Sequence, residues 1–160
     1  MTLDKRERFL GNGETLSFEL TFCYLRGAQF FDIHPVHFEK SNFAHSNLDG
    51  AKFIAAHLEQ ANFFGASLAG ADLSGAELPG AKLAHCNLSL AKAELAHFEG
   101  AEFDGANLRG ANLIGAYLHG ANLEAAASLQ DTNLHGATGL TDEQRQICIA
   151  MGALIEASAG

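Results

Sequence analysis

Leu or Phe recurs at every fifth residue from Phe38 to Leu123, with one exception. Residues 36–125 divide into 18 consecutive five-residue repeats, and the central residue is Leu or Phe in all of them except the one centred on Ala93. Ala lies two places before the centre in 14 of the 18 repeats. The pattern therefore reserves two positions of every five for apolar side chains.

A period of five fits neither an α-helix nor a flat strand. On a helix each residue turns about 100°, so successive centres would lie about 140° apart and share no stripe. In a strand the side chains alternate, so an odd step would put successive centres on opposite faces. A backbone that turns about 90° per repeat instead brings every centre to one axis. Coils of about 20 residues then stack through parallel β pairing to build one continuous core.

The central residues are the predicted core of this coil. The small residue two places earlier also points inward, whereas the fifth position lies at a corner, where turns need a positive φ or tight packing. The predicted core consists of Phe38, Phe43, Leu48, Phe53, Leu58, Phe63, Leu68, Leu73, Leu78, Leu83, Leu88, Phe98, Phe103, Leu108, Leu113, Leu118 and Leu123.

Several repeats, among them AKFIA, ANFFG, ADLSG, ANLRG and ANLIG, resemble the pentapeptide-repeat family and its A(D/N)LxG consensus. The resemblance implies an all-β fold, a right-handed quadrilateral parallel β-helix of roughly six coils. It implies no catalytic residues and no cofactor, because members of this family are not generally enzymes. It is closest to the Ala-Asn-Leu-rich members common in cyanobacteria and other bacteria, most of which have no assigned activity.

The limits of the five-residue period define three segments of the chain. Residues 1–15 lack the period and are predicted to form an N-terminal cap or loop. Residues 16–139 are predicted to form the β-helix, with irregularities at 31–35 and 125–127, where the spacing departs from five. Residues 140–160 are predicted to hold a short capping α-helix and a tail.

The predicted C-terminal helix begins at a capping box. Thr141 occupies the N-cap and Gln144 the third helical position, and the helix is expected to continue to about Met151. Its apolar face is expected to seal the open end of the β-helix. Ile149 projects from the opposite side, which motivates the hypothesis of a homodimer formed through the C-terminal end.

Composition narrows the range of partners and compartments. The net charge is −9 with only 10 Lys and Arg residues, which argues against direct nucleic-acid binding. No apolar stretch is long enough for a membrane span and the N-terminal residues do not resemble a signal peptide, so we expect a cytoplasmic protein without a membrane partner. The three dispersed cysteines are expected to be small buried side chains, not disulfides or metal ligands.

One face of the predicted coil carries His beside Glu. Residues 20 apart stack on the same face, so three His form one row and three Glu form the next. Two His one coil apart, with a neighbouring Glu, are able to bind a divalent metal ion. We prefer the simpler interpretation, that these are solvated outward positions where any polar residue serves; a surface that changes charge between about pH 5 and 7 is a further alternative. The candidate metal ligands are His37, His57, His97, Glu39, Glu59 and Glu99.

Two other outward features receive structural interpretations. Asn often precedes the central residue, and its side chain is expected to bind local backbone at the turn. Five large apolar residues, Ile54, Phe64, Leu90, Leu95 and Ile114, occupy outward or corner positions and are expected to be exposed. For Leu90 and Leu95, which flank Ala93, the alternative is that they tuck into the space that the missing large side chain leaves.

The sequence specifies a shape more clearly than a function. No nucleophile, base and orienting group can be assembled from the spacing, so the chain is predicted not to be an enzyme. We expect a structural or protein-interaction module with rigid faces and an unknown protein partner. One alternative, drawn from the quinolone-resistance members of the family, is an acidic mimic of DNA that binds a topoisomerase such as DNA gyrase. The second alternative is divalent-metal binding by the His and Glu rows.

Overall fold

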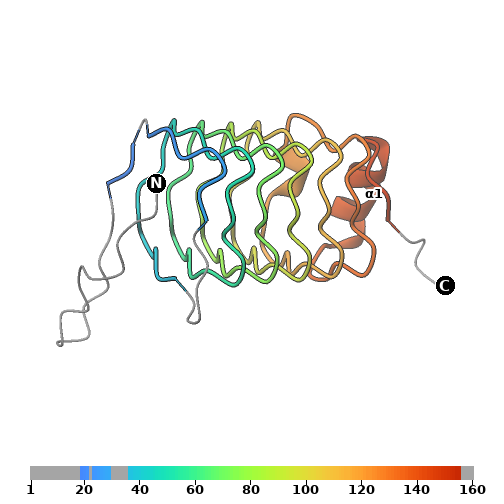
Figure 1. Ribbon diagram of the computed structural model, residues 1–160. Helices are drawn as coiled ribbons and strands as arrows, with labels where there is room; N and C mark the ends of the chain where they lie inside the picture. The colour runs from blue at the N-terminus through green and yellow to red at the C-terminus, as the bar shows by residue number, and fades with distance from the viewer. Residues whose placement is uncertain (1–18, 22, 30–35, 156–160) are drawn as a thin grey trace.

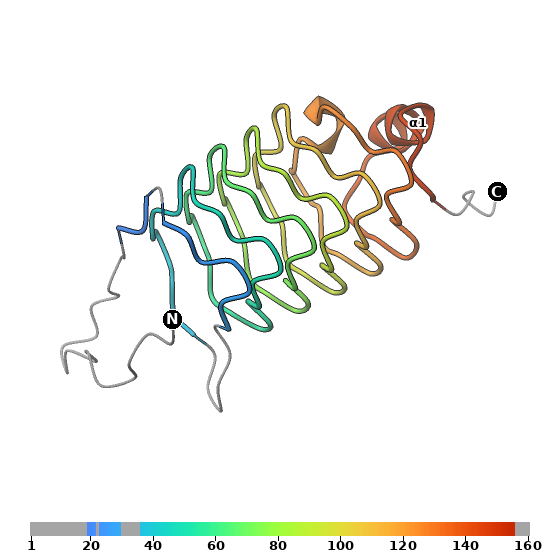
Figure 2. The ribbon, with the colours of Figure 1, turned by 45° about the horizontal axis from the view of Figure 1, so that its top comes forward.

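The computed structural model describes residues 19–21, 23–29 and 36–155. In these residues the chain winds into a stack of coils that ends at helix α1 (Figure 1). Corresponding sides of successive coils lie one above another (Figure 2). The predicted N-terminal segment 1–15 and the irregular stretch 31–35 lie outside the described residues.

The coils pair through single parallel β-bridges at the residue before each centre, except before Leu123. His37 pairs with His57 and His57 pairs with Glu77, so the register between coils is 20 residues. On this side of the coil Phe38 N donates to the His57 carbonyl at 2.7 Å, and His57 N donates to the Val36 carbonyl at 2.9 Å. Each bridge is one residue long because the chain soon turns again. The described residues therefore contain parallel β pairing but no extended strand, which qualifies the all-β expectation.

The chain turns at the fifth position of each repeat except the last, which ends at Ala125, through a residue with positive φ. At Gly70 φ is 64°, and the turn closes with a hydrogen bond from Ala71 N to the Leu68 carbonyl at 3.0 Å, as in a type II turn. Glycine adopts this conformation without strain. Eight residues other than glycine in the described chain also have positive φ: Lys40, His45, Ala55, Gln60, His85, Leu90, Leu95 and Asp131.

A continuous column of apolar side chains fills the axis of the coil. All 17 predicted core side chains are at most 2% exposed. In the early coils the column is aromatic: the rings of Phe43 and Phe63 stack with centroids 4.9 Å apart, and Phe53 meets both of them edge-on. Such ring pairs add to the free energy gained from burying apolar surface.

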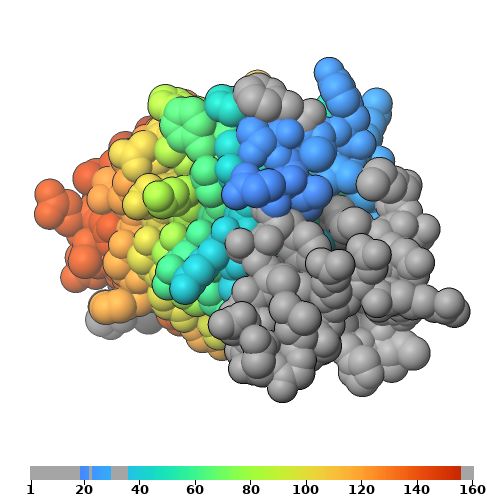
Figure 3. Space-filling model, turned by 90° about the vertical axis from the view of Figure 1, so that its left-hand side faces the viewer, coloured from blue at the N-terminus to red at the C-terminus, as the bar shows by residue number. Residues whose placement is uncertain are grey.

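The register of the coil changes near its N-terminal end. The bridge from Gln29 to Lys52 spans 23 residues, whereas the bridge from His37 to His57 spans 20. Three extra residues therefore lie between Gln29 and His37. In Figure 3, which views the molecule from that end, the described residues up to 29 (blue) lie in the upper part of the end face.

The register changes again near the C-terminal end. From the bridge between Asn107 and Ser128 onward, the offset is 21 residues instead of 20. The 3₁₀-helix η1 (Leu123–Ala125) lies within this coil and accommodates the extra residue. The irregularity expected at 125–127 thus takes the form of one helical turn.

Helix α1 (Asp142–Ala150) lies at the C-terminal end of the stack. Its N-terminus is a capping box: Gln144 N donates to Thr141 Oγ1 at 3.1 Å, and Thr141 N donates to Gln144 Oε1 at 3.0 Å. The Gln144 amide also donates to the Ala121 carbonyl at 3.0 Å, which ties the helix to the coil beneath it. Cys148 is fully buried, whereas Ile149 is 43% exposed. Neither helix in the described part of the chain is long and apolar enough to cross a membrane.

Candidate functional surfaces

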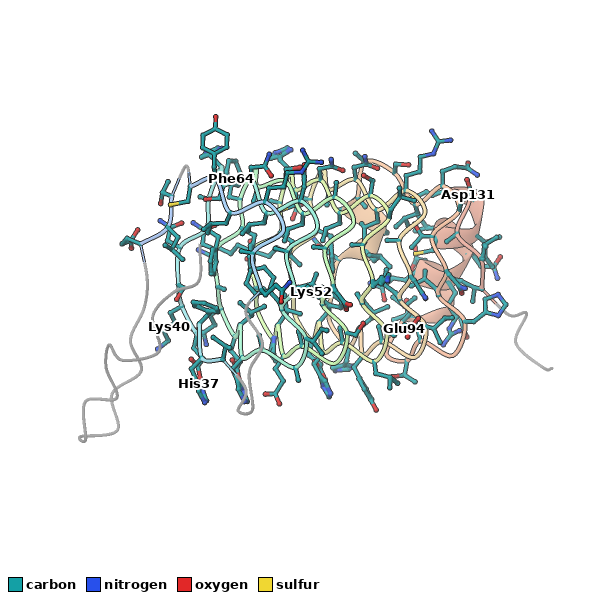
Figure 4. The ribbon with its side chains drawn as sticks, in the orientation of Figure 1. His37, Lys40, Lys52, Phe64, Glu94 and Asp131 are labelled. Carbon is teal, nitrogen blue, oxygen red and sulfur yellow. The ribbon has the colours of Figure 1, made fainter. Side chains whose placement is uncertain are left out.

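Three His and four Glu form a polar strip on one side of the solenoid, which we call the His–Glu face. Each His precedes a core residue and the paired Glu follows it, so both project outward from the same short segment. Figure 4 shows His37 at the lower edge of the coil, away from Phe64 at the upper edge. The His–Glu face consists of His37, Glu39, His57, Glu59, Glu77, His97 and Glu99.

The structure brings each of the predicted His–Glu pairs into contact. The distances from His Nδ1 to Glu Oε1 are 2.7 Å in His37–Glu39, 3.2 Å in His57–Glu59 and 3.2 Å in His97–Glu99. The rings of His37 and His57 stack with centroids 4.6 Å apart and planes within 1°. The rows predicted from the 20-residue spacing are therefore present, and adjacent coils touch through them.

His57 differs from the other two His because a second carboxylate reaches it. Glu77 Oε2, from the next coil, lies 3.1 Å from His57 Nδ1. Burial lowers the pKa of His57, but the hydrogen bond to Glu59 and the negative charges of Glu77, Glu59 and Glu39 outweigh it and raise the pKa above its ordinary value. His57 is thus the most negatively surrounded imidazole of the face.

Glu77 was not among the predicted ligands, although the 20-residue register pointed to it. It occupies the position that His fills in the two neighbouring coils, and this made it look like an interruption of the His row. In the structure it completes a group of three potential ligands with His57 and Glu59, whose ligand atoms lie within 4.8 Å of one another.

The remaining predicted ligands fall into two further arrangements. His37, Glu39 and His57 form a second group of three with ligand atoms within 4.8 Å. His97 contacts Glu99, but its ring stacks on Tyr117 of the next coil at a centroid distance of 4.3 Å. In the described residues, His97 and Glu99 belong to neither three-ligand group.

The Asn residues before the centres bind local backbone, as predicted. Asn62 Oδ1 accepts a hydrogen bond from Phe64 N at 3.0 Å, and its amide donates to Asn42 Oδ1 of the preceding coil at 3.1 Å. Asn107 repeats the arrangement, accepting from the Arg109 backbone N and donating to Asn87 Oδ1. These side chains stabilise the turns and the stacking of coils and are not candidates for a binding site.

Leu90 and Leu95 are exposed, as their corner positions predicted, and the alternative that they tuck into the space at Ala93 is wrong. Their side chains are 69% and 59% exposed and do not fill the space at Ala93. Each occupies a corner with positive φ and leans along the outside of the coil toward the next glycine corner, Leu90 over Gly110 and Leu95 over Gly115. The left-handed corner directs them outward, and this cannot be read from the apolar character of the residues.

The charges on the side that contains Leu90 and Leu95 alternate along the stack. Lys52, Asp72 and Lys92 follow one another through parallel bridges in three successive coils. Figure 4 shows Lys52 on the same broad side as Glu94. This side therefore carries no continuous row of carboxylates.

Comparison with known proteins identifies the repeat. A family model described as pentapeptide repeats, with 8 copies, matches residues 36–68, 56–92, 94–126 and 101–138, which together make up more than half of the chain. A search of curated proteins found no match.

Solved structures with the same repeat are also similar to this chain. A pentapeptide repeat protein from the thylakoid lumen of Arabidopsis thaliana is 27% identical, with a TM-score of 0.51, over 91% of this chain and 84% of that one. HetL, a pentapeptide repeat protein involved in heterocyst differentiation regulation in Nostoc sp. strain PCC 7120, is 34% identical, with a TM-score of 0.44, over 74% of this chain and 59% of its own. QnrB1, a plasmid-mediated fluoroquinolone resistance protein, is 18% identical, with a TM-score of 0.39, over 89% of this chain and 84% of its own. The chain therefore belongs to the pentapeptide-repeat family and has its right-handed β-helical solenoid fold.

Proposed function

We propose that the protein is a non-enzymatic interaction module that binds a protein partner through the side carrying Leu90, Leu95 and Ile114, which we call the leucine face. The observation that carries the proposal is the exposure of Leu90 and Leu95, at 69% and 59%, on corners where φ is 58° and 57°. A residue other than glycine in this conformation costs roughly 1–2 kcal/mol. Leu at these corners therefore adds strain and gains little burial within the chain itself.

The surroundings of the two leucines fit a protein interface. Ile114 is 40% exposed and adjoins Leu95, whose backbone N donates to the Ile114 carbonyl at 2.9 Å. Lys92 and Glu94 lie between the two leucines in sequence and supply charges beside the apolar side chains. Apolar anchors with a polar rim are typical of protein interfaces. The hydrogen-bonded coils hold the anchors rigidly, which reduces the entropy lost on binding.

The leucine face can be tested with glycine, because glycine suits the positive φ of these corners. The double variant Leu90→Gly/Leu95→Gly is expected to fold at least as stably as the wild type while it loses the partner. Pull-downs from the source cell with both forms would be compared by quantitative mass spectrometry. The captured protein would then be titrated against each form, and at least about tenfold weaker binding by the variant is expected.

A matched control alters two other corners in the same way. Lys40 and Gln60 also have positive φ, at 58° and 57°. Lys40→Gly/Gln60→Gly should retain the partner with unchanged affinity. Equal capture by the wild type and the Leu90→Gly/Leu95→Gly variant would reject the leucine face as the binding surface. If the captured protein is a second copy of this chain, the face mediates self-association and does not bind a different partner.

Mimicry of DNA is the alternative function, and the net charge of −9 is its support. A mimic needs extended rows of negative charge, whereas Lys52 and Lys92 flank Asp72 along one side of the stack. Inhibition of DNA gyrase in a supercoiling assay by this protein, but not by a denatured sample, would favour mimicry over the interaction module.

At its C-terminal end we propose that the module is closed by α1 after about six coils. The buried Cys148 and the hydrogen bond from Gln144 to the Ala121 carbonyl support this role. Gln144→Ala removes the bond from Thr141 N to the Gln144 side chain and the anchor to Ala121 together, so faster hydrogen exchange is expected in the last coil and not in the middle coils. Uniform exchange changes would contradict the proposal.

A further inference from the structure

We propose that the His–Glu face binds one divalent metal ion, Zn²⁺ being the best match, through His57, Glu59 and Glu77. This site is independent of the leucine face, because the two lie on different sides of the repeat. The proposal gives the His–Glu face a binding role, whereas the simpler interpretation treats its side chains as solvated polar residues only.

The distances between the ligand atoms suit a tetrahedral ion. His57 Nδ1 lies 3.2 Å from Glu59 Oε1 and 3.1 Å from Glu77 Oε2. Zinc bonds to nitrogen and oxygen of about 2.0–2.1 Å place neighbouring ligand atoms about 3.3 Å apart in a tetrahedron. Two of the three edges therefore have nearly the required length, and rotation of the carboxylates can adjust the third, which is within 4.8 Å.

The electrostatics of the group also favour a cation. Nδ1 of His57 carries at most one hydrogen, so it cannot make a full hydrogen bond to both carboxylates. Both distances exceed the usual 2.9 Å of such a bond. Glu59 Oε2 is enclosed and has no hydrogen-bond partner, a feature that it shares with Oε2 of Glu39 and of Glu99. A divalent ion in place of the shared hydrogen would contact all three side chains and balance both carboxylate charges.

The backbone holds the three ligands in place before an ion arrives. His57 and Glu77 form a parallel bridge, and Leu58 N donates to the Glu77 carbonyl at 2.7 Å, which fixes the separation of the two coils. The stacked ring of His37 limits the orientations that His57 can adopt. Preorganised ligands lose less entropy on binding. The mixed nitrogen and oxygen donors suit Zn²⁺ better than Mg²⁺ or Ca²⁺, which prefer oxygen ligands in larger number.

The overlapping group of His37, Glu39 and His57 fits an ion less well. The imidazole lone pairs lie in the ring planes, and the two rings are parallel within 1° at 4.6 Å, so their lone pairs do not converge. The distance from His37 Nδ1 to Glu39 Oε1 is 2.7 Å, the length of a full hydrogen bond, so this pair is already matched without an ion. We therefore assign the ion to the group that includes Glu77.

Isothermal titration calorimetry of the full chain, freed of metal with a chelator, tests the site with Zn²⁺ as the probe. We expect one ion per chain. His57→Ala and Glu77→Gln should each weaken binding at least about tenfold, a loss that even a residue supporting a ligand can cause. His57 and Glu77 project outward, so circular dichroism should show both variants folded. Co²⁺ provides a second readout, because a tetrahedral site gives visible absorption that both variants should lose.

The matched control is the pair His97–Glu99, which lacks a third ligand and whose His ring stacks on Tyr117. His97→Ala/Glu99→Gln should bind Zn²⁺ as the wild type does, and titration with Mg²⁺ should give no saturable binding. Absence of Zn²⁺ binding, equal binding by His57→Ala, or equal losses in the control variant would overturn the proposal. A tenfold loss in His37→Ala without a loss in Glu77→Gln would also overturn it, in favour of the overlapping group.

Discussion

Phe63 and Phe64 are neighbours in the sequence but belong to two different regions, the axial column and the outer wall. Phe63 is fully buried and stacks on Phe43 at 4.9 Å. Phe64 is 43% exposed and forms T-shaped ring pairs with His45 and His85, each at a centroid distance of 5.5 Å. The position within the repeat, and not the type of residue, decides whether a side chain builds the fold or faces a partner.

The column and the wall also differ in what they tolerate. A column position must be filled by an apolar side chain of suitable size, because packed interiors leave few voids. A wall position accepts His, Glu, Lys, Leu or Phe on the same backbone. Functional surfaces of this solenoid are therefore expected on the wall, where outward side chains of similar chemistry lie next to one another in neighbouring coils.

The largest expected effect separates these two phenylalanines. Phe63→Ala should lower the free energy of unfolding by about 3–5 kcal/mol, because it removes a large buried ring and leaves a cavity. Phe64→Ala should lower it by less than about 1 kcal/mol, because the ring is already partly in water. Urea titration of both variants measures the difference, and similar losses would show that the wall ring also supports the fold.

The corners, which join column and wall, should give the next largest effect. Gly70 and Gly105 both have φ of 64°, so replacement by Ala should strain each by roughly 1–2 kcal/mol. A Cβ at Gly70 meets nothing within 4 Å, whereas a Cβ at Gly105 would lie 2.5 Å from His85 Nδ1. Gly105→Ala should therefore be more destabilising by about 1 kcal/mol.

A double variant tests whether the His85 ring is the cause. In His85→Gly/Gly105→Ala the contact no longer exists, so the added destabilisation relative to Gly70→Ala should disappear. Thermal unfolding of the single and double variants measures the coupling. An additive result would indicate that the ring moves aside without cost.

The contrast between column and wall explains which parts of the fold and of the candidate site can be predicted from the sequence. The core column follows from the five-residue period, because only one coil geometry buries every Leu and Phe. The contacts between His and Glu follow from the 20-residue register. The exposure of Leu90 and Leu95 follows from their corner positions in the repeat, whereas the tuck at Ala93 fails because positive φ at these corners, where Gly is the common residue, directs both side chains outward. The grouping of Glu77 with His57 and Glu59 was not predicted, because a group of potential ligands that spans two coils is not a continuous motif in the sequence.

The buried thiol of Cys86 makes the stability of the column depend on pH. It replaces Ala at an inward position, lies 2.7 Å from the Phe63 carbonyl, and burial raises the pKa of its thiol from 9.0 to about 12. The unfolded chain loses this proton above about pH 9 while the folded chain keeps it. The contribution of the thiol to stability is therefore constant below pH 9 and falls as the pH rises from 9 to 12.

The control for Cys86 is Ala, the residue that most other repeats have at this position. Cys86→Ala should show a smaller loss of unfolding free energy between pH 8 and pH 10.5 than the wild type, because the remaining titrating groups are common to both proteins. Chemical denaturation at the two pH values measures this. Equal losses would mean that the buried thiol does not stay protonated in the folded chain.

The smallest expected effect on stability lies at Ile149, on the wall formed by α1. The residue is 43% exposed, whereas its neighbour Cys148 is fully buried, so Ile149→Glu should change the free energy of unfolding by no more than about 0.5 kcal/mol. If the C-terminal end forms a two-fold dimer, the same variant should shift the mass measured by light scattering from dimer to monomer. Gln146→Glu, also exposed on α1, adds a carboxylate without removing apolar surface and should remain dimeric. A monomeric wild type would contradict the dimer. Ile149 would then be an exposed outer residue like Phe64, and the only role of α1 would be to pack on the coil beneath it.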